Sequence, residues 1–250
     1  MIELMDHQKG PAEKLRSGNL LRGGVGSGKS IVALWKYTQD CLGDLIVITT
    51  AKKRDSLEWQ KDALGFGIFE SREHSHYGTI TVDSWNNIGK YEDVESCTFI
   101  FDEQRLVGYG AWVKSFLKIV RKKDKTKENQ WFLLSGTPGD TWLDYAPLFI
   151  ANGYYRNITD FKEQHVIYAA YSKFPKVEGY RNIKKLEAIQ RAVTVEMPYN
   201  HHTERHNEMV EVLFDEVEFK DIARRRWNPY TDAPCKDFAE LFRVLRRVAT

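Results

Sequence analysis

The sequence predicts an α/β protein in which a mostly parallel sheet is followed by a mainly helical extension. Short, almost wholly apolar runs alternate with stretches that are long enough to hold helices. Strands that are apolar on both faces are typical of a parallel sheet covered by helices on both sides. Two polar segments, at 23–30 and 102–103, directly follow such runs. Function in these folds collects where strands end in loops, so we expect the site there.

Four runs are predicted to be buried strands, and a fifth is a weaker candidate. They are NLL at 19–21, LIVITT at 45–50, TFIFDE at 98–103 and WFLLSG at 131–136, with TITV at 79–82 as the weaker one. Helices are expected between them, for example over Lys29–Gln39 and Asp55–Leu64. The charged run at 121–129 is typical of a solvated loop between a helix and a strand.

After Asp140 the pattern changes, and clear buried strands are no longer evident. Aromatic residues become dense in WLDYAPLFIANGYY, and helical patterns dominate. The last segment, DFAELFRVLRRVAT, has apolar residues at helical spacing with arginines elsewhere around the helix, which predicts an amphipathic helix. We therefore expect one lobe at residues 1–140 and a helical extension at residues 141–250.

The composition favours a soluble, cytoplasmic protein. The 37 basic and 35 acidic residues give a net charge of +2, so any affinity for nucleic acid must come from local basic faces. Cys41, Cys97 and Cys235 form no CxxC pair, which argues against a zinc site or a disulfide framework. No apolar run approaches the roughly 18 to 20 residues that span a bilayer, and the first residues do not resemble a secretory signal.

Residues 23–30 read GGVGSGKS and match the phosphate-binding pattern G-x-x-x-x-G-K-[ST] between a strand and a helix. Glycines let backbone N–H groups surround phosphate oxygens, and the helix N-terminus adds positive potential. Lys29 is expected to neutralise the β- and γ-phosphates, and Ser30 to bind Mg²⁺. The sequence thus predicts ATP and Mg²⁺ as ligands, with ATP held by Gly23, Gly24, Val25, Gly26, Ser27, Gly28, Lys29 and Ser30.

An acidic pair ends the strand of TFIFDEQR. Asp102 is placed to hold Mg²⁺, and Glu103 to orient or deprotonate an attacking water. A carboxylate placed to activate a water molecule favours a hydrolase. Many kinases instead need a pocket that holds the acceptor of the phosphoryl group. Lys29, Asp102 and Glu103 are therefore the predicted catalytic residues.

The run LLSGTPGD at 133–140 ends a predicted strand in a polar turn. Ser135, Thr137 and Pro138 are ordinary turn residues, so the segment has a purely structural explanation. A hydroxyl pair at a strand end is also suited to sense the phosphates of a neighbouring nucleotide. The sequence alone is compatible with both a structural turn and a phosphate-sensing turn.

These motifs together resemble the first RecA-like lobe of superfamily 2 helicases and translocases. The similarity is to the Swi/Snf-like branch, and most of all to helicases encoded by bacteriophages. GGVGSGKS resembles motif I, IFDEQR the DExx box and SGTP motif III; VITTAKKRDSLEWQKD at 47–62 is similar to motif Ia, ITVDSWNNI at 80–88 to the next nucleic-acid-contacting segment, and LMDHQKGPAEKL at 4–15 to the upstream His-Gln element. The likeness covers residues 4 to about 155.

The resemblance implies a RecA-like lobe of an ATP-dependent helicase or translocase that acts on DNA more readily than on RNA. Gln8 would read the adenine base, and Ser135 and Thr137 would couple the nucleotide site to the nucleic acid. The expected nucleic-acid contacts are Thr50, Lys52, Lys53, Arg54, Ser84 and Trp85. Basic groups at 121–127, 224–226 and 243–247 are weaker candidates, and they could instead face a missing lobe. A phage-encoded protein would work in the host cytoplasm.

Hydrolysis in this family uses arginines from a second RecA-like lobe, and such an arginine contributes roughly 10³ to 10⁵ in rate. No segment after Asp140 resembles the motifs of that lobe, and the arginines of IARRRWN stand in a charged helical context. We expect slow hydrolysis unless a second lobe is supplied, either by another polypeptide or by chain that this sequence lacks.

Two other functions remain as alternatives. Gly23-Gly24 also resembles the loop of viral DNA-packaging terminases, but nothing after residue 140 supplies the acidic cluster of their nuclease. A non-catalytic module that binds ATP as a regulatory ligand would not need Glu103 beside Asp102.

The sequence also departs from the family pattern. Directly after the Asp-Glu pair it has Gln104-Arg105, where relatives often have a His or Asp, and this affects the coupling expected between ATP hydrolysis and nucleic acid. The run HHTERH, with His201, His202 and His206, does not match the zinc pattern HExxH.

Overall fold

The computed structural model describes residues 3–40, 42–103, 110–170, 174–198 and 214–249. The expectations for Cys41, Gln104, Arg105 and the three histidines at 201–206 fall outside these ranges. The chain divides into two compact units, at residues 1–200 and 201–250. Within the described ranges, no helix is both long and apolar enough to cross a membrane.

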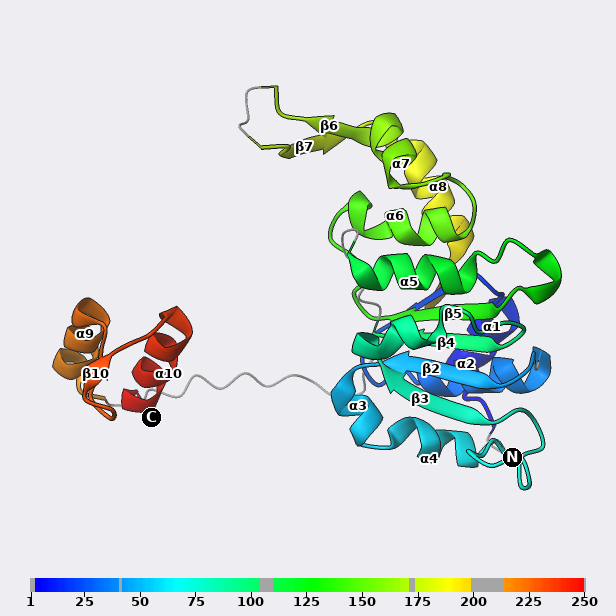
Figure 1. The fold of residues 1–250 in the computed structure, drawn as a ribbon, viewed down its shortest axis with the longest axis horizontal. Coiled ribbons are helices and arrows are strands. Elements are labelled where there is room, and N and C mark those ends of the chain that lie inside the picture. The colour runs from blue at the N-terminus through cyan, green and yellow to red at the C-terminus, as the bar shows by residue number, and fades with distance from the viewer. Residues whose placement is uncertain (1–2, 41, 104–109, 171–173, 199–213, 250) are drawn as a thin grey trace. The chain divides into compact units, whose positions relative to one another are not determined.

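A six-stranded, all-parallel sheet forms the centre of the first unit, with strand order β3-β2-β4-β5-β1-β8. Figure 1 shows β3, β2, β4 and β5 side by side in this order. Its strands are β1 (Leu20–Gly23), β2 (Leu45–Thr49), β3 (Ile80–Ser84), β4 (Thr98–Asp102), β5 (Gln130–Ser135) and β8 (Thr194–Met197). All five runs predicted as strands are strands of this sheet. The predicted α/β class with a mostly parallel sheet is therefore confirmed.

The sixth strand, β8, was not predicted, and the expectation that buried strands end at Asp140 was wrong. β8 pairs in parallel with β1, with Leu21 opposite Val195 and Gly23 opposite Met197. Only alternate residues of this edge strand are buried, so TVEM has no continuous apolar run for a sequence pattern to detect.

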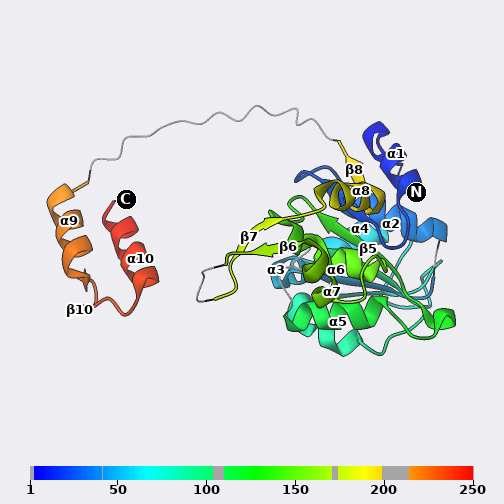
Figure 2. The same ribbon diagram turned by 90° about the horizontal axis from the view of Figure 1, so that it is seen from above.

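Two hydrophobic layers cover the two faces of the sheet, because successive residues of each buried strand point to opposite sides. Leu45 and Val47 of β2 pack with α1 (Asp6–Lys14), α2 (Lys29–Asp40) and α4 (Glu58–Leu64). Ile46 and Ile48 pack with the 3₁₀ helix η1 (Trp85–Tyr91), α5 (Ala111–Val120) and α6 (Trp142–Ala151). α2 and α5 thus lie on opposite faces of the sheet (Figure 2).

The helix expected over Asp55–Leu64 is α4, which begins at Glu58, and a separate short helix, α3 (Ala51–Asp55), precedes it; α2 matches its prediction. Leu57 between them has a φ of 58°, which a continuous right-handed helix does not allow. This break lets α3 lie directly after β2, so its basic residues stand at the end of the sheet.

Residues 141–198 are mainly helical, as predicted for the segment after residue 140, and pack on the sheet through an aromatic cluster. α7 (Ile158–His165) and α8 (Ile183–Val193) follow α6, with an antiparallel hairpin of β6 (Val166–Tyr168) and β7 (Val177–Tyr180) between them. The rings of Phe149, Tyr155 and Phe161 contact one another in the same core as β4 and β5. The functional boundary expected at residue 140 stays a prediction, while the compact units divide at residue 200.

The second unit contains α9 (Glu216–Arg225), the short pair β9 (Trp227–Asn228) and β10 (Ala233–Pro234), and α10 (Phe238–Val248). Ile222, Leu241 and Val244 form its small core. The amphipathic helix predicted at the end of the sequence is α10. Phe238 and Phe242, which were counted on its apolar face, are largely exposed.

Candidate nucleotide-binding site

The carboxyl ends of β1, β4 and β5 meet at one edge of the sheet, where they surround a cavity of about 720 Å³. The glycine-rich loop, the acidic pair and the SGTP turn all line it, so three motifs far apart in the sequence share one space. The lining residues are Val25, Gly26, Gly28, Lys29, Ser30, Lys53, Asp102, Glu103, Leu134, Ser135, Gly136 and Thr137. Such an edge is where ligands bind in open α/β sheets.

The glycine-rich loop leaves β1 at Gly23 and enters α2 at Lys29. Gly26 and Gly28 have φ of 78° and 81°, a left-handed conformation that glycine adopts without strain. Ser27 is buried, and its hydroxyl donates to the carbonyl of Gly24 at 2.9 Å, which closes the turn. The loop therefore has the tight backbone path that phosphate binding requires.

The ammonium of Lys29 folds back onto this loop. Its Nζ donates to the carbonyls of Gly23 at 2.7 Å and Gly24 at 2.8 Å. Burial lowers the pKa of Lys29, and this effect exceeds the opposing attraction of Asp102. A half-buried ammonium held only by neutral carbonyls is well placed to exchange them for an anion, whose charge would stabilise it more strongly.

Asp102 ends β4 with its carboxylate almost wholly buried, at 3% exposure for the residue. Its Oδ2 accepts from Thr49 Oγ1 at 3.0 Å, Lys53 Nζ at 3.0 Å and Trp59 Nε1 at 3.1 Å. Its Oδ1 accepts from the backbone N–H of Glu103 at 2.9 Å. This network fixes the carboxylate at the strand end.

Glu103 continues from Asp102 in a left-handed conformation, with a φ of 50°. Non-glycine residues held in this region are strained, and such strain gathers at functional sites. The side chain is 43% exposed and lines the cavity. Its Oε1 lies 3.2 Å from Lys53 Nζ, so one ammonium contacts both members of the acidic pair.

Lys53 was predicted to contact nucleic acid, which stays a prediction; the structure places its ammonium in the same cavity, against the acidic pair. α3 begins directly after β2, so its first turn brings this ammonium to the acidic pair. Burial by itself would lower the pKa of Lys53, but Asp102 and Glu103 outweigh it, and the pKa lies above its ordinary value. A cation at this position also shows that the two carboxylates favour a positive charge, which fits the Mg²⁺ role predicted for Asp102.

Ser30, the other predicted Mg²⁺ ligand, donates from Oγ to Asp62 Oδ2 of α4 at 3.2 Å. Burial raises the pKa of Asp62. A hydroxyl, one or two carboxylates and phosphate oxygens form a donor set that suits Mg²⁺. Asp62 and Trp59 were missed as site residues, although both belong to the segment at 47–62 that resembles motif Ia.

Gln8 is buried beneath the glycine-rich loop. Its Nε2 donates to the carbonyl of Ser27 at 3.4 Å, and its Oε1 accepts from the backbone N–H of Met5 at 2.9 Å. A Cβ at Gly28 would lie 2.2 Å from the Gln8 amide nitrogen, so loop and side chain fit closely. The adenine-reading role of Gln8 stays a prediction; its observed contacts support the loop.

The SGTP turn follows β5 directly. Ser135 is buried and its Oγ accepts from the backbone N–H of Thr137 at 3.2 Å, whereas Thr137 is exposed. This bond is ordinary turn chemistry, yet both residues line the nucleotide cavity. The turn and the coupling interpretations are therefore compatible, and coupling stays a prediction.

The remaining nucleic-acid candidates differ in accessibility. Thr50 caps α3 by accepting from the N–H of Lys53 at 3.3 Å, and Lys52 is exposed. Arg54 is ion-paired with Asp55 at 2.8 Å and with Asp83 at 3.6 Å.

Ser84 and Trp85 are almost wholly buried, although both line a small cavity of about 170 Å³ beside Thr50. Their contact with nucleic acid stays a prediction. The indole N–H of Trp85 donates to the carbonyl of Asp102 at 3.0 Å. Its ring packs on Phe101 and Trp112, with centroids 5.7 and 6.2 Å away. Phe116 and Ile119 belong to the same core, and Trp112 packs against it.

The fold resembles that of solved helicase and ATPase domains. One is the Sulfolobus solfataricus SWI2/SNF2 ATPase core domain, with a TM-score of 0.52 at 15% identity over 78% of this chain and 43% of that one. Another is the Pyrococcus furiosus Hef helicase domain, with a TM-score of 0.43 at 15% identity over 65% of this chain and 40% of that one. The likeness to the Sulfolobus domain shows the fold alone, which is an α/β lobe of the RecA-like kind.

This chain spans less than half the length of each of these two proteins. No protein-family model matches the sequence, and the comparison with curated proteins gives no match either. The likeness to the Sulfolobus protein therefore concerns the RecA-like fold, and the roles of the site residues rest on the geometry of the cavity.

Proposed function

We propose that this chain is the first motor lobe of an ATP-dependent DNA helicase or translocase. The observation that carries the proposal is the single cavity that joins Lys29 and Ser30 of the phosphate loop to Asp102 and Glu103. A phosphate cradle opposite a buried carboxylate, with a second carboxylate exposed beside it, is the arrangement that nucleotide hydrolysis needs.

In the proposed reaction, Lys29 leaves the carbonyls of Gly23 and Gly24 and binds the β- and γ-phosphates. Ser30 and Asp102 would hold Mg²⁺, which when bound supplies neutralisation of the phosphate charge. Lys53 yields its position against the acidic pair, and Glu103 is freed to orient a water toward the γ-phosphate. Ser135 and Thr137 line the same cavity, so they would lie near the γ-phosphate and would transmit its loss to the neighbouring surface.

The nucleic acid is proposed to run past the carboxyl edge at β2 and α3. Thr50 and Lys52 are available there, and Arg54 becomes available when it leaves Asp55 and Asp83. Lys53 is directly linked to these residues, because Lys52 and Arg54 flank it in α3 and its backbone N–H donates to Thr50 Oγ1 at 3.3 Å. This connection between the acidic pair and α3 supports α3 as part of the coupling.

Efficient hydrolysis is proposed to require a second RecA-like lobe that supplies arginines to the phosphates. The experiment is steady-state ATP turnover by the purified chain, measured with and without DNA, beside binding of a non-hydrolysable ATP analogue. We expect analogue binding with turnover far below that of complete motors, whether or not DNA is present. Strong DNA-stimulated turnover would refute the need for a second lobe, and absence of analogue binding would refute the motor assignment itself.

A further inference from the structure

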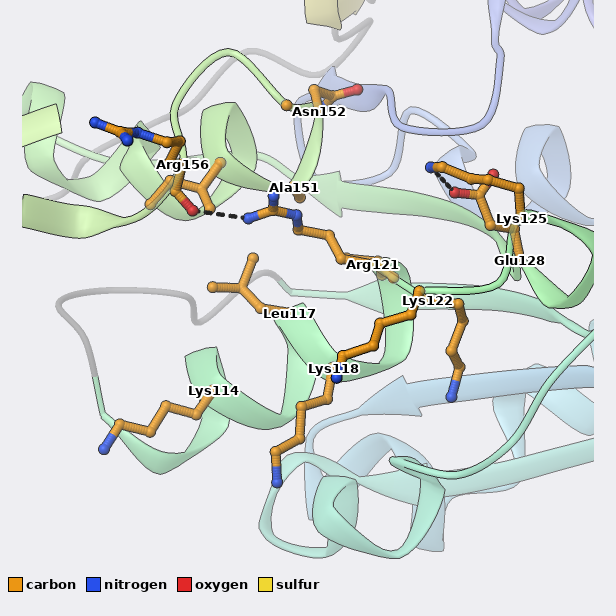
Figure 3. A pocket seen from close by; sticks show the side chains of 14 residues that line it. Lys114, Leu117, Lys118, Arg121, Lys122, Lys125, Glu128, Ala151, Asn152 and Arg156 are labelled. Carbon is orange, nitrogen blue, oxygen red and sulfur yellow. Dashed lines mark hydrogen bonds and ion pairs between the residues drawn. The ribbon is translucent and has the colours of Figure 1, made fainter. Parts of the chain in front are cut away.

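A second cavity, of about 780 Å³, lies between the C-terminal part of α5 and the segment after α6 (Figure 3). We call it the basic groove and define its charged lining as Lys114, Lys118, Arg121, Lys122, Lys123, Lys125, Glu128 and Arg156. It shares no lining residue with the nucleotide cavity. The nearby Asn129 bonds the end of α5 to the start of β5, so the groove lies toward the amino ends of the strands, away from the nucleotide edge.

Charge in the groove is concentrated in one sign. Seven lining residues are basic and one is acidic, whereas the whole chain has 37 basic and 35 acidic residues. Three of the basic residues have carboxylate partners: Lys118 pairs with Glu92 at 2.6 Å, Lys125 with Glu128, and Arg156 with Asp160 at 3.9 Å. Lys114, Arg121 and Lys123 form no ion pair within the described part of the chain. The groove therefore keeps an excess of positive charge.

The ends of two helices explain some of the basic residues in the groove. α5 and α6 both end at the groove, and cations near a helix C-terminus are stabilised by the partial negative charge there. Arg121 acts in this local way, since its guanidinium donates to the carbonyl of Arg156 at 3.0 Å (Figure 3). Lys123 and Arg156 lie outside both helices, and Lys114 lies well before the end of α5. Their charges are not accounted for by the helix ends.

The arrangement suits a chain of regularly spaced anions. Lys114 and Lys118 extend from successive turns of α5, roughly 6 Å apart along the axis, a separation comparable with that of neighbouring phosphates on a strand (Figure 3). Arg156 approaches from a different segment. The side chains of Lys118 and Arg156 are 65% and 89% exposed, so both are accessible despite their ion pairs. Leu117 and Val120 give the groove an apolar floor against which sugar rings can pack.

The geometry points to a nucleic-acid backbone as the occupant of the basic groove. Protein partners usually present both signs of charge, whereas a phosphate backbone is uniformly anionic and matches a lining of uniform sign. This contact is separate from the one proposed at α3, and it does not require bound nucleotide. It favours one of two interpretations from the sequence, in which the basic group at 121–127 was a weaker nucleic-acid candidate and the charged run at 121–129 was typical of a solvated loop.

The test uses Lys114→Glu/Lys123→Glu in the full chain, with Lys176→Glu/Lys184→Glu as the matched control. All four side chains are exposed and form no hydrogen bond or ion pair among the described residues, and both variants change the net charge equally. The probes are a fluorescent mixed-sequence DNA duplex, its single strand and a polyglutamate peptide, each titrated without nucleotide over a series of salt concentrations.

We expect the groove variant to bind DNA roughly tenfold more weakly, with a salt dependence reduced by about 1 per lost lysine contact. The control should bind as the wild-type chain does. The proposal is overturned by equal binding in all three proteins, by equal losses in both variants, or by a loss confined to polyglutamate, which would indicate an acidic protein partner. If charge reversal disturbs folding, Lys114→Gln/Lys123→Gln must show the same ranking.

Analogue binding by the same preparations separates this inference from the proposed ATPase function. If the groove variant binds both the ATP analogue and DNA as the wild-type chain does, only the proposal for the basic groove is refuted. If the wild-type chain does not bind the analogue but binds DNA through the groove, only the proposed nucleotide site is refuted.

Discussion

The Nζ of Lys53 lies 3.0 Å from Oδ2 of Asp102 and 3.2 Å from Oε1 of Glu103, so a cation of the chain itself sits against the acidic pair. This ion pair joins α3, the proposed nucleic-acid element, to the carboxylates proposed for the metal and the water. If Mg²⁺ and ATP bind as proposed, they must displace Lys53, and we propose that this competition connects nucleotide binding to nucleic-acid binding at α3.

Replacing Lys53 with Met should raise the affinity of the nucleotide-free chain for Mg²⁺ by about tenfold, equal to about 1.4 kcal/mol. The acidic pair would then lack its internal counter-ion. The free energy of unfolding should fall by about 1 kcal/mol, the lower end of the range for a lost charged partner, because Lys53 is 35% exposed. Calorimetric Mg²⁺ titration and denaturant unfolding measure the two effects.

The control is Lys52→Met, which removes an adjacent, exposed lysine with no ion pair in the described part of the chain. It should leave Mg²⁺ binding and stability unchanged. Equal Mg²⁺ affinities in wild type and Lys53→Met would show that the lysine does not compete with the metal.

The glycine-rich loop offers a matched pair of substitutions. Gly26 and Gly28 share a left-handed φ, but a Cβ meets no atom within 4 Å at Gly26 and meets Gln8 Nε2 at 2.2 Å at Gly28. Alanine at either position should destabilise the fold by about 1 to 2 kcal/mol through backbone strain. Gly28→Ala should cost more, since Gln8 must also give up its bond to the loop.

Combining Gly28→Ala with Gln8→Ala isolates this contact. In the Gln8→Ala background, the two glycine substitutions should lower the melting temperature by similar amounts. A persistent excess for Gly28→Ala would mean that Gln8 is not what restricts the loop.

His165 predicts a pH dependence of stability. Burial lowers its pKa more than the Arg181 carbonyl raises it, and its Nε2 lies 2.7 Å from the Tyr155 hydroxyl. Below an ordinary pKa of about 6.5, the unfolded chain takes up a proton that the folded chain resists. Stability should therefore be full above that pH and decrease as the pH falls below it.

The measurement is denaturant unfolding from pH 7.5 downward, for wild type and His165→Gln. The glutamine does not titrate, so the stability advantage of the wild type should shrink as the solution becomes more acidic. Two parallel curves would exclude His165 as the cause.

Trp85→Phe tests whether Trp85 is structural. The substitution removes the bond to the carbonyl of Asp102 and part of a buried ring, so stability should fall by about 1 to 3 kcal/mol. DNA affinity at a temperature well below unfolding should stay within about twofold of wild type. A larger loss of affinity in a folded variant would restore the direct contact that the resemblance implied.

The sequence predicted those parts of the fold that carry strong local patterns. β2, β4 and β5 are continuous apolar runs, and the glycines at 26 and 28 are needed for backbone conformations that other residues adopt only with strain. β8 escaped prediction because a half-buried edge strand of four residues has too little periodicity.

The motifs of the candidate site could be predicted from the sequence, but most of the side-chain contacts between them could not. Asp102 and Lys29 were placed by their positions after strands, but the bonds from Lys53 and Trp59 to Asp102 depend on how α3 and α4 break at Leu57. Trp85 was expected to contact nucleic acid because its segment resembles a nucleic-acid-contacting motif, whereas the packing of η1 against α5 buries its ring. The basic groove gathers residues from separate segments, which linear spacing does not reveal.

The most direct test of the central claim is calorimetric titration of a non-hydrolysable ATP analogue with Mg²⁺ into the wild-type chain, Lys29→Ala and Lys52→Ala. The cavity described above predicts saturable binding by the wild type and by Lys52→Ala, and binding at least about tenfold weaker in Lys29→Ala, a loss of about 1.4 kcal/mol or more. Equal affinity in all three proteins, or no binding to a folded wild-type chain, would contradict the claim that triphosphate and metal bind between the phosphate loop and the acidic pair.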